Sequence, residues 1–226
     1  MVVFGKQTFL YILEKHPYMI KEIYLSKEID KKLFLKISKL NKKIIKLDNK
    51  KAQALAHGGN HQGFLLKIEE FNYIEFNDIK HYSFILVLVG VTDSANIGSI
   101  IRSAYSLGVE AIIISGVGSI NLSTVARTST GALFDMPISL KKDTLSIINE
   151  LKQSGFCIYG ADMSGKDVRE MKFNHKKALL LGSEGEGLSG KILKNVDTRV
   201  SIKMQREFDS LNVAVSAALL CDRMRL

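Results

Sequence analysis

The chain has 226 residues, 46% of them hydrophobic, and a formal net charge of +9 at pH 7. This composition is that of an ordinary globular protein, and the longest apolar runs, such as residues 84–89, are too short to cross a membrane. The first residues lack the layout of a signal peptide, and two cysteines cannot form a disulfide framework. We therefore expect a cytoplasmic protein with reduced thiols.

Positive charge is concentrated in the first part of the chain. Residues 1–80 contain 15 Lys, no Arg and nine acidic residues, and residues 31–51 contain nine Lys with one acidic residue. A surface that follows the phosphates of RNA is one interpretation. A solvated lysine-rich face is the other, and charge alone does not decide between them.

The first part of the chain alternates between helical and extended patterns. Apolar spacing predicts helices at 8–14, 29–40 and 52–56, and strands at 20–25, 43–47 and 63–68. The sequence thus predicts a small α/β domain over residues 1–68. Residues 69–82 show no clear period and are expected to be a linker to a second domain at 83–226.

The second part begins with a βαβ pattern. An apolar strand at 84–89 precedes a turn, a helix at 96–107 and another buried strand at 111–114, and a helix capped by Asp143 or Thr144 ends at Gly155. Further strands are predicted at 156–159, 178–181 and 199–202. This alternation predicts a parallel α/β sheet, whose ligands bind beyond the carboxyl ends of the strands. The loops after Val89, Leu181 and Ile202 are therefore the candidate sites.

The first of these loops leads into the segment Asn96-Ile-Gly-Ser-Ile-Ile-Arg102. On a helix, Asn96 and Arg102 fall on one face and the isoleucines on the other. An amide and a guanidinium at a helix N-terminus suit an anionic ligand. A capping Asn followed by a solvated Arg explains the same residues without a ligand.

The second loop, Leu180-Leu-Gly-Ser-Glu-Gly-Glu-Gly-Leu188, has three glycines in six residues after a buried strand. The glycine spacing is not the dinucleotide fingerprint, and no phosphate-binding lysine follows. A conventional nucleotide-binding oxidoreductase is therefore disfavoured. The two glutamates suit a ligand with positive charge or free hydroxyls, whereas a glycine turn with solvated carboxylates is the alternative.

The third segment, residues 202–213, runs into a final helix that is apolar on nearly all sides. Ser210 and Asn212 are suitable helix caps. One apolar side can pack on the sheet, and the other is expected to meet a second subunit.

These three segments resemble the three motifs of the SpoU, or TrmH, RNA methyltransferases, in the same order. The first resembles N-x-G-x-x-x-R, the second L-G-x-E-G-x-G-L and the third I-P-M-x-G-x-x-x-S-L-N-V, and Ser129-Thr-Gly-Ala-Leu133 resembles an S-x-G-A-L segment between them. The resemblance covers residues 84–226. The first domain, with Phe4-Gly-Lys-Gln-Thr8 and His61-Gln-Gly-Phe64, is similar to the ribosomal-protein-like substrate-binding domain of the rRNA-modifying RlmB branch.

The resemblance implies a parallel sheet with a deep C-terminal trefoil knot, S-adenosylmethionine as cofactor, RNA as substrate and a homodimer formed through the final helix. It implies that the cofactor is held by Gly182, Ser183, Glu184, Gly185, Gly187, Ile202, Met204 and Leu211. Its implied catalytic residues are Asn96, Arg102, Glu184, Ser210 and Asn212.

The chemistry suits these residue types. Methyl transfer requires the alcohol, the methyl carbon and the sulfur in line, so positioning supplies much of the catalysis. A guanidinium stays protonated in proteins, so we assign Arg102 to gripping a phosphate and polarising the 2′-hydroxyl instead of removing its proton. Asn96 would orient Arg102 or the ribose, Glu184 would hold the site geometry, and Ser210 and Asn212 would fix the third loop.

The sequence also departs from the family pattern. Lys203 and Arg206 stand where motif three has Pro and Gly, and Asp93-Ser94 stands where motif one has Asp-Pro. The added positive charge could serve RNA binding or weaken cofactor affinity.

Three functions remain open. The first is 2′-O-methylation of a guanosine in 23S rRNA, which the N-terminal domain favours. The second is methylation of tRNA or of the rRNA site linked to thiopeptide resistance, and the third is RNA binding by a catalytically weak homologue. No metal is expected, because His57 and His61 lack cysteine partners and are interpreted as surface or RNA-contacting residues.

Overall fold

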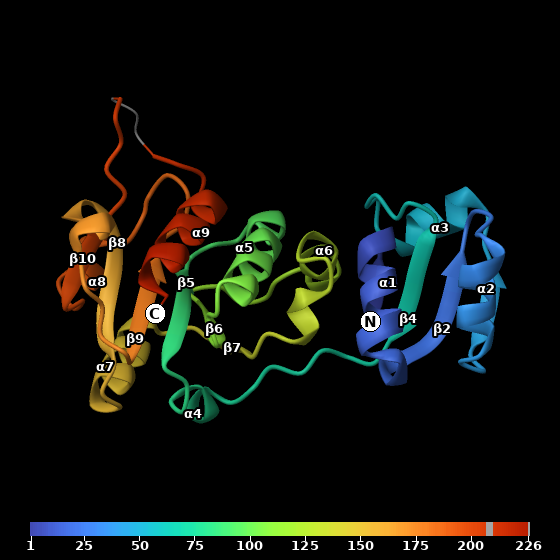
Figure 1. Ribbon diagram of the computed structural model, residues 1–226, viewed down its shortest axis with the longest axis horizontal. Helices are drawn as coiled ribbons and strands as arrows, with labels where there is room; N and C mark the ends of the chain where they lie inside the picture. Colours follow the sequence, from blue (N-terminus) through green and yellow to red (C-terminus); the bar gives the residue numbers. More distant parts are fainter. Residues whose placement is uncertain (207–209, 226) are drawn as a thin grey trace. The chain divides into compact units, whose positions relative to one another are not determined.

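The computed structural model describes residues 1–206 and 210–225. The chain forms two compact units (Figure 1), unit 1 from Met1–Asn72 with Asn121–Asp135 and unit 2 from Tyr73–Ile120 with Met136–Leu226. None of the helices in the described ranges combines the length and the apolar character that crossing a bilayer requires.

Unit 1 has a four-stranded sheet in the order β1-β4-β2-β3, in which β2 and β3 are parallel and the other pairs antiparallel. Its main elements are β1 (Val2–Phe4), α1 (Lys6–Lys15), β2 (Ile20–Leu25), α2 (Lys31–Ser38), β3 (Lys43–Lys46), α3 (Asn49–Leu55), β4 (Phe64–Ile68) and α6 (Leu122–Thr128), with short 3-10 helices η1 (Pro17–Met19) and η2 (Ala132–Phe134). The helices and strands predicted for this part are confirmed, and β1 is added.

One prediction for unit 1 is wrong. His61 was expected to be a surface or RNA-contacting residue, but only 6% of it is exposed. Its Nδ1 atom accepts a hydrogen bond from the backbone N–H of Gly63 at 3.0 Å. His61 therefore holds the turn that leads into β4, which is a structural role.

The segment 121–135 packs within unit 1, although it lies between two strands of the other unit in the sequence. The Thr8 hydroxyl donates to the carbonyl of Ala126 at 3.0 Å in a buried position, and the Tyr11 hydroxyl donates to Asp135. Gly131 has a left-handed φ of +98°, and a β-carbon there would lie 2.5 Å from the Tyr11 ring. The segment 121–135 therefore forms a packed contact surface for the first 72 residues. This contact was not predicted from the sequence.

Unit 2 has a parallel six-stranded sheet in the order β10-β8-β9-β5-β6-β7. Its elements are α4 (Phe76–Ile79), β5 (Phe84–Val89), α5 (Ser94–Ser106), β6 (Ala111–Ser115), β7 (Ile138–Lys141), α7 (Thr144–Gln153), β8 (Cys157–Asp167), η3 (Val168–Glu170), β9 (Lys177–Leu181), α8 (Gly190–Leu193), β10 (Thr198–Ser201) and α9 (Val213–Met224). The predicted α/β class is confirmed. The predicted linker contains the short helix α4.

The strands of unit 2 are buried on both faces, as their continuous apolar runs predicted. Along β5, Ile85 and Val87 belong to the core cluster that includes side chains of α4 and α7. Leu86 and Leu88 are equally buried, and alternation directs them to the opposite face. Figure 1 shows α5 and α9 side by side in unit 2, where they pack on one another.

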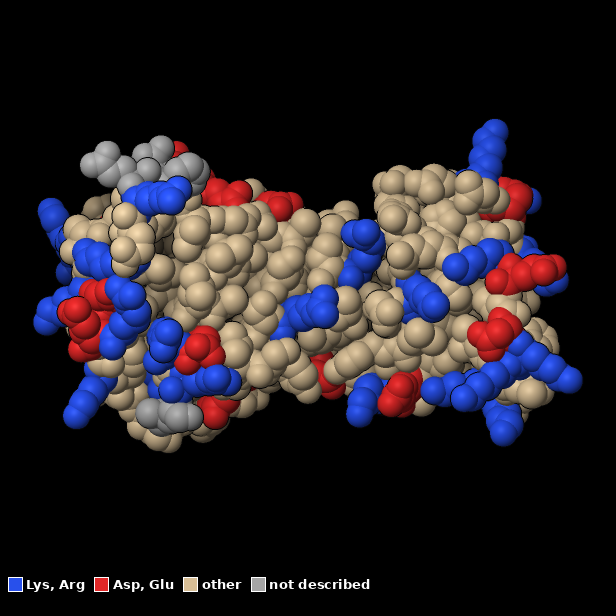
Figure 2. Space-filling model, turned by 45° about the horizontal axis from the view of Figure 1, so that its top comes forward, with Lys and Arg blue, Asp and Glu red and all other residues tan. Residues whose placement is uncertain are grey.

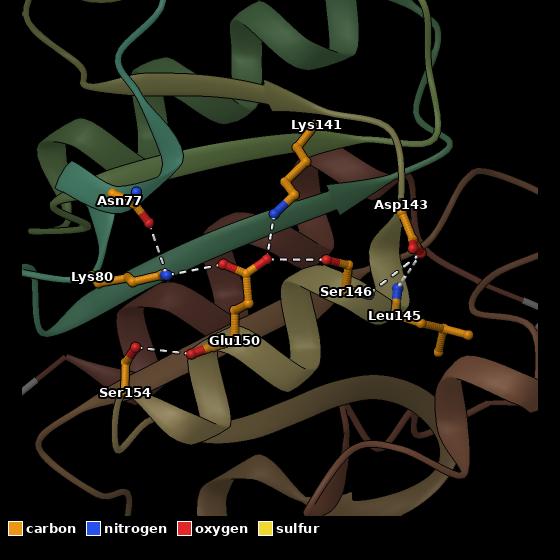
Figure 3. A network of polar contacts seen from close by, with 8 residues as sticks. All are labelled: Asn77, Lys80, Lys141, Asp143, Leu145, Ser146, Glu150 and Ser154. Carbon is orange, nitrogen blue, oxygen red and sulfur yellow. Dashed lines mark hydrogen bonds and ion pairs between the residues drawn. The ribbon is translucent and has the colours of Figure 1, made fainter.

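A polar network joins α4, β7 and α7 at the edge of this core (Figure 3). The Glu150 carboxylate accepts hydrogen bonds from Lys141 at 2.5 Å, from Lys80 at 2.9 Å and from Ser146 at 3.0 Å. Lys80 also donates to Asn77 at 2.9 Å. These contacts hold the pKa of Glu150 at about 2, and hydrogen bonding to Lys141 is the largest cause. The network therefore links the end of α4 and the end of β7 to α7.

Candidate functional site

A pocket of about 670 Å³ lies where β8, β9 and β10 end, and this volume is in the range of small-molecule sites. Four stretches of chain form it: the middle of β8, the loop after β9, the segment after β10, and the start of α9 with the residues before it. Its lining residues include Ala161, Asp162, Met163, Gly182, Ser183, Glu184, Gly185, Glu186, Gly187, Ile202, Met204, Ser210, Leu211, Val213 and Ser216.

The pocket lies beside the point where the strand order reverses. From β5 the chain continues through β6 and β7 on one side, whereas β9, β8 and β10 lie on the other. The connections that follow β5 and β9 run to opposite sides of the sheet, and this leaves a crevice between the two loops. Open parallel sheets bind ligands in a crevice of this kind. The loop after β9 turns back on itself, and this brings it to the loop after β5. A β-carbon at Gly90 would lie 4.0 Å from the Ser183 β-carbon.

The glycines of the second loop are required by its backbone. Gly185 and Gly187 have φ of +89° and +63°, in the left-handed region that favours glycine. A β-carbon at Gly182 would lie 2.0 Å from the carbonyl carbon of Gly187. The N–H of Gly187 also donates to the carbonyl of Ser183 at 3.0 Å. The loop is therefore a tight turn that presents backbone, not side chains, to much of the pocket.

A polar cluster joins the three motif segments at the edge of the pocket. The Glu184 carboxylate accepts hydrogen bonds from the Asn212 side-chain amide at 2.6 Å and from the Asn96 side-chain amide at 3.1 Å. It also accepts a longer one from the N–H of Val213 at 3.4 Å. The Asn212 amide donates to the Asn96 carbonyl oxygen at 3.1 Å. Glu184 lies 88 positions after Asn96 in the sequence and Asn212 lies 116 positions after it, yet the three side chains meet at the Glu184 carboxylate.

Both asparagines are placed by helix starts. Asp93 caps α5, because its carboxylate accepts from the N–H groups of Ala95 and Asn96 at 3.1 Å. Asn212 caps α9 itself, with its oxygen accepting from Ala214 at 2.9 Å while its amide faces Glu184. Asp93 retains this role without the proline of the family pattern. Two helix N-termini and a carboxylate thus converge, an arrangement that the helix dipole stabilises.

Arg102 lies two turns further along α5 and is exposed. Within residues 1–206 and 210–225, its guanidinium makes no hydrogen bond or ion pair with another side chain. Asn96 bonds to Glu184 and Asn212 instead of to Arg102. The guanidinium is therefore available to a ligand, and nothing in the described structure supports its orientation by Asn96.

The eight residues expected to hold the cofactor all line the pocket. Ser210 also lines it, whereas Asn96, Arg102 and Asn212 do not belong to its lining. Lys203 and Arg206 are exposed and are absent from the lining as well, although their neighbours Ile202 and Met204 contribute to it. Residues 207–209 of the third motif lie outside the described residues.

The part of the pocket wall that β8 forms was not predicted from the sequence. The register between β10 and β8 shifts by several residues, because Arg199 pairs with Gly160 and the next residue, Val200, pairs with Lys166. Residues 161–165 therefore bulge out of the ladder and bring Asp162 and Met163 to the pocket. The Asp162 carboxylate accepts from the N–H of Ser164 at 3.0 Å. The signal in the sequence is a turn-forming Asp-x-Ser-Gly after a buried strand.

The cysteines and histidines offer no second site. Cys157 and Cys221 are both free, and burial raises the pKa of the Cys221 thiol to about 12. Across the part of the chain that the structure describes, no three His, Cys, Asp or Glu side chains are grouped to hold a metal ion.

A parallel α/β unit with a ligand pocket at its switch point defines the class of this chain, and sequence comparison gives the family. The SpoU rRNA methylase family matches residues 83–222, and the family described as RNA 2′-O ribose methyltransferase substrate binding matches residues 2–74. The chain therefore belongs to the SpoU rRNA methylase family and has that family's substrate-binding domain.

Named relatives agree with this assignment. A protein of Borreliella burgdorferi named as an uncharacterized tRNA/rRNA methyltransferase is 34% identical over 195 residues, which cover 80% of this chain and 86% of the relative. A protein of Staphylococcus epidermidis named as a TrmH family tRNA/rRNA methyltransferase is 32% identical over 195 residues, covering 82% and 78% of the two chains.

Solved structures share the fold. An AdoMet-bound rRNA methyltransferase from Sinorhizobium meliloti superimposes with a TM-score of 0.79 at 21% identity, over 98% of this chain and 85% of that one. The SpoU methyltransferase AviRb from Streptomyces viridochromogenes, in complex with AdoMet, has the same TM-score at 23% identity, over 99% and 88%. These likenesses confirm the expected two-domain α/β architecture.

Proposed function

We propose that this protein is an S-adenosylmethionine-dependent RNA 2′-O-ribose methyltransferase that modifies a guanosine in 23S rRNA. The observation that carries the proposal is the meeting of Asn96, Glu184 and Asn212 beside a pocket large enough for a nucleoside-sized ligand. Family membership supports methyl transfer to RNA. The substrate-binding domain supports rRNA over tRNA as the target.

The residues of the pocket fit this cofactor. Its walls combine apolar side chains with the open backbone of the glycine loop, and its side-chain charges are the carboxylates of Asp162, Glu184 and Glu186. S-Adenosylmethionine carries a sulfonium, an amino group and ribose hydroxyls, all of which suit carboxylates and carbonyl oxygens. A pyrophosphate ligand would be repelled by the same charges. When bound, the cofactor supplies an electrophilic methyl group.

The chain's own residues bind and orient the RNA. Arg102 is free to grip a phosphate of the target nucleotide and to polarise its 2′-hydroxyl, which then loses its proton to phosphate or water. Glu184 holds Asn96 and Asn212 in place, so the starts of α5 and α9 keep a fixed spacing at the pocket. Ser210 lies at the pocket wall, and we assign it to holding the third segment there.

The role of Arg102 is tested by replacing it. Arg102→Ala is expected to lower the rate of methyl transfer at saturating cofactor by about 100-fold or more, since loss of a positioning contact has effects of that size. The dissociation constant of S-adenosylmethionine, measured by calorimetry, should not change. Asn96→Ala should lower the rate as well, because it releases one side of the Glu184 cluster. Near-normal turnover of both variants would refute the assignment.

The function itself is tested by incubating the protein with labelled cofactor and separated rRNA and tRNA. Mapping the methylated position by mass spectrometry should locate a ribose of a guanosine in 23S rRNA. Label in tRNA, or at another rRNA position, would favour the second candidate, since relatives are named tRNA/rRNA methyltransferases. No label, together with no heat of cofactor binding, would instead identify an RNA-binding homologue without turnover.

The organisation of the molecule is part of the proposal. We assign residues 1–68 to RNA substrate binding, 69–82 to a linker and 83–226 to methyl transfer, in a cytoplasmic protein that meets RNA there. A knotted C-terminus is supported by the pocket, because the loop after β9, the segment after β10 and α9 all line it. Tracing these segments in an electron-density map would reveal whether the chain threads through the loop.

A homodimer is the last element of the proposal, and α9 supports it. One face of this helix is buried in unit 2 through Val213, Ala217, Leu220, Cys221 and Met224. The other face leaves Val215 and Leu219 exposed by 48% and 44%. Tyr105 of the neighbouring α5 is also exposed. Large apolar side chains gathered on adjacent helices are typical of subunit interfaces.

A further inference from the structure

We propose that four cations at the β8–β10 edge of unit 2, Lys166, Arg199, Lys203 and Arg206, form a basic strip that binds the phosphate backbone of the substrate RNA beside the pocket. The inference deepens the proposed function and rests on it. All four side chains are exposed.

The four cations lie along one edge of the sheet and the segment that follows it. β10 is the edge strand, and its Val200 pairs with Lys166 of β8, whereas Arg199 pairs with Gly160. Lys166 and Arg199 are therefore one position apart along the ladder, where alternation directs successive side chains to opposite faces. Lys203 follows the last residue of β10 by two positions, and the chain leads on to Arg206 beside the pocket.

The positions of the last two cations differ from those of their neighbours. Ile202 and Met204 contribute to the pocket wall, whereas Lys203 and Arg206 are exposed and lie outside the lining. The positive charges therefore stand on the solvent side of the pocket rim and do not occupy cofactor space. Lys203 and Arg206 stand where the third motif has Pro and Gly. The rim of the pocket therefore carries two positive charges that the family pattern lacks, while Ile202 and Met204 still line the pocket.

Ion pairs neutralise some of the other cations of unit 2. Lys80 and Lys141 are bound by Glu150, Lys152 by Asp197, and Arg169 by Asp167. Within the described ranges, no ion pair engages Lys166, Arg199, Lys203 or Arg206. A surface cation that is not neutralised by a neighbour is free to bind a phosphate.

Among the described residues, Asp167 is the buried carboxylate near the strip, and it already has a partner. It accepts hydrogen bonds from the Arg169 guanidinium at 3.1, 3.0 and 2.6 Å. These bonds are the main cause that holds its pKa at about 2, to which the charge of Lys203 adds a smaller contribution. Because Arg169 already neutralises Asp167, this carboxylate does not balance the positive charge of Lys203.

Figure 2 shows the charged side chains on one face of the molecule. Lys and Arg side chains gather over the part of unit 2 that contains β8, β10 and α8, and acidic side chains are fewer there. A phosphate backbone is the ligand that such a strip fits, since each of its residues can meet one phosphate while the target ribose enters the pocket.

The test removes the two rim charges. The double variant Lys203→Ala with Arg206→Ala should weaken RNA binding by about 5- to 8-fold for each cation removed, in 0.1 M salt. The slope of log Kd against log salt concentration should fall by about 0.7 to 1 for each cation. The affinity for S-adenosylmethionine, measured by calorimetry, should stay unchanged, which also shows that the variant is folded.

Two matched controls accompany the variant. Lys203→Arg with Arg206→Lys keeps both charges and should bind RNA like the wild type. Lys142→Ala removes an exposed lysine beside β7, at the opposite edge of the sheet, and should leave the salt slope unchanged.

The outcomes separate the two proposals. If the wild type methylates RNA and the double variant keeps its Km for RNA and its salt slope, the strip is refuted and the proposed function stands. If the wild type transfers no methyl group but binds RNA with a salt slope that the double variant lowers, the proposed function fails and the strip stands. A weakened affinity for S-adenosylmethionine would mean that the two cations support the cofactor pocket, which would also overturn the strip.

Discussion

Gly182 begins the glycine loop at a point where no side chain fits. An added β-carbon would lie 2.0 Å from the carbonyl carbon of Gly187, in backbone that cannot move aside cheaply. We therefore expect Gly182→Ala to destabilise the loop by about 1–3 kcal/mol, as overpacking does. The affinity for S-adenosylmethionine in calorimetry should fall about 10-fold or more, because the same backbone forms the pocket wall.

Gly190, eight residues further on, is the matched control for this substitution. No atom lies within 4 Å of the position that its β-carbon would take, and it begins α8. Gly190→Ala should leave both cofactor affinity and the melting temperature nearly unchanged, since alanine is the better helix former. Equal loss of affinity in the two variants would show that the close approach at Gly182 is not the cause.

Individual site residues differed in how far the sequence revealed them. Asn96, Glu184 and Asn212 were expected from the resemblance to the family's motifs, but their meeting at one carboxylate depends on the strand order, which no local pattern contains. Asp162 was missed because a bulge and not a loop brings it to the pocket. His61 was misassigned because its burial comes from packing in unit 1.

At the level of elements, the Glu150 network predicts how the stability of unit 2 depends on pH. The pKa of this carboxyl is about 2 in the folded protein and near its ordinary value of 4.5 in the unfolded chain. Because the folded pKa is the lower one, the stabilisation is present above pH 4.5 and is lost as the pH falls towards 2. Its size is on the order of 1 kcal/mol, since the side chain is 32% exposed and solvent screens the pairs.

Glu150→Gln should therefore lower the melting temperature of unit 2 at pH 6 by a few degrees and have little effect at pH 2. Scanning calorimetry between pH 6 and pH 2 measures the difference. Glu75→Gln serves as the control, because within the described residues the Glu75 carboxylate makes no hydrogen bond or ion pair. If the melting temperatures of Glu150→Gln and the wild type differed by the same amount at every pH, this explanation would be contradicted.

The elements themselves were largely predictable. Helix periodicity, buried apolar runs and capping residues located most strands and helices to within a few residues, including the cap at Asp143 and the left-handed Gly155 at the end of the same helix. The exceptions have physical reasons. β1, β7, α4 and α8 were not predicted, because three or four residues are too few to show a period, and the seven-residue helix α6 was not predicted either. β8 continues beyond the expected strand because its bulge interrupts the apolar alternation.

At the scale of the whole molecule, sequence order and spatial grouping differ in one place. Residues 121–135 lie between β6 and β7 of unit 2 in the chain but pack against α1 and β1 of unit 1. The Ser-x-Gly-Ala-Leu segment found in the sequence is therefore part of a contact surface, in which Gly131 leaves room for Tyr11. A motif can be required by packing as well as by chemistry, and only the structure separates the two.

The proposed dimer makes the last prediction. Val215 and Leu219 are one helical turn apart on the uncovered face of α9, so Val215→Glu with Leu219→Glu would bury two unpaired charges in the interface. An uncompensated buried charge costs about 3–5 kcal/mol. Sedimentation equilibrium should therefore show the wild type at twice the mass of the chain and the double variant at the mass of one chain. Leu35→Glu changes a side chain of α2 that is 52% exposed, and it should leave the dimer intact. A double variant that sediments like the wild type would show that α9 does not form the interface.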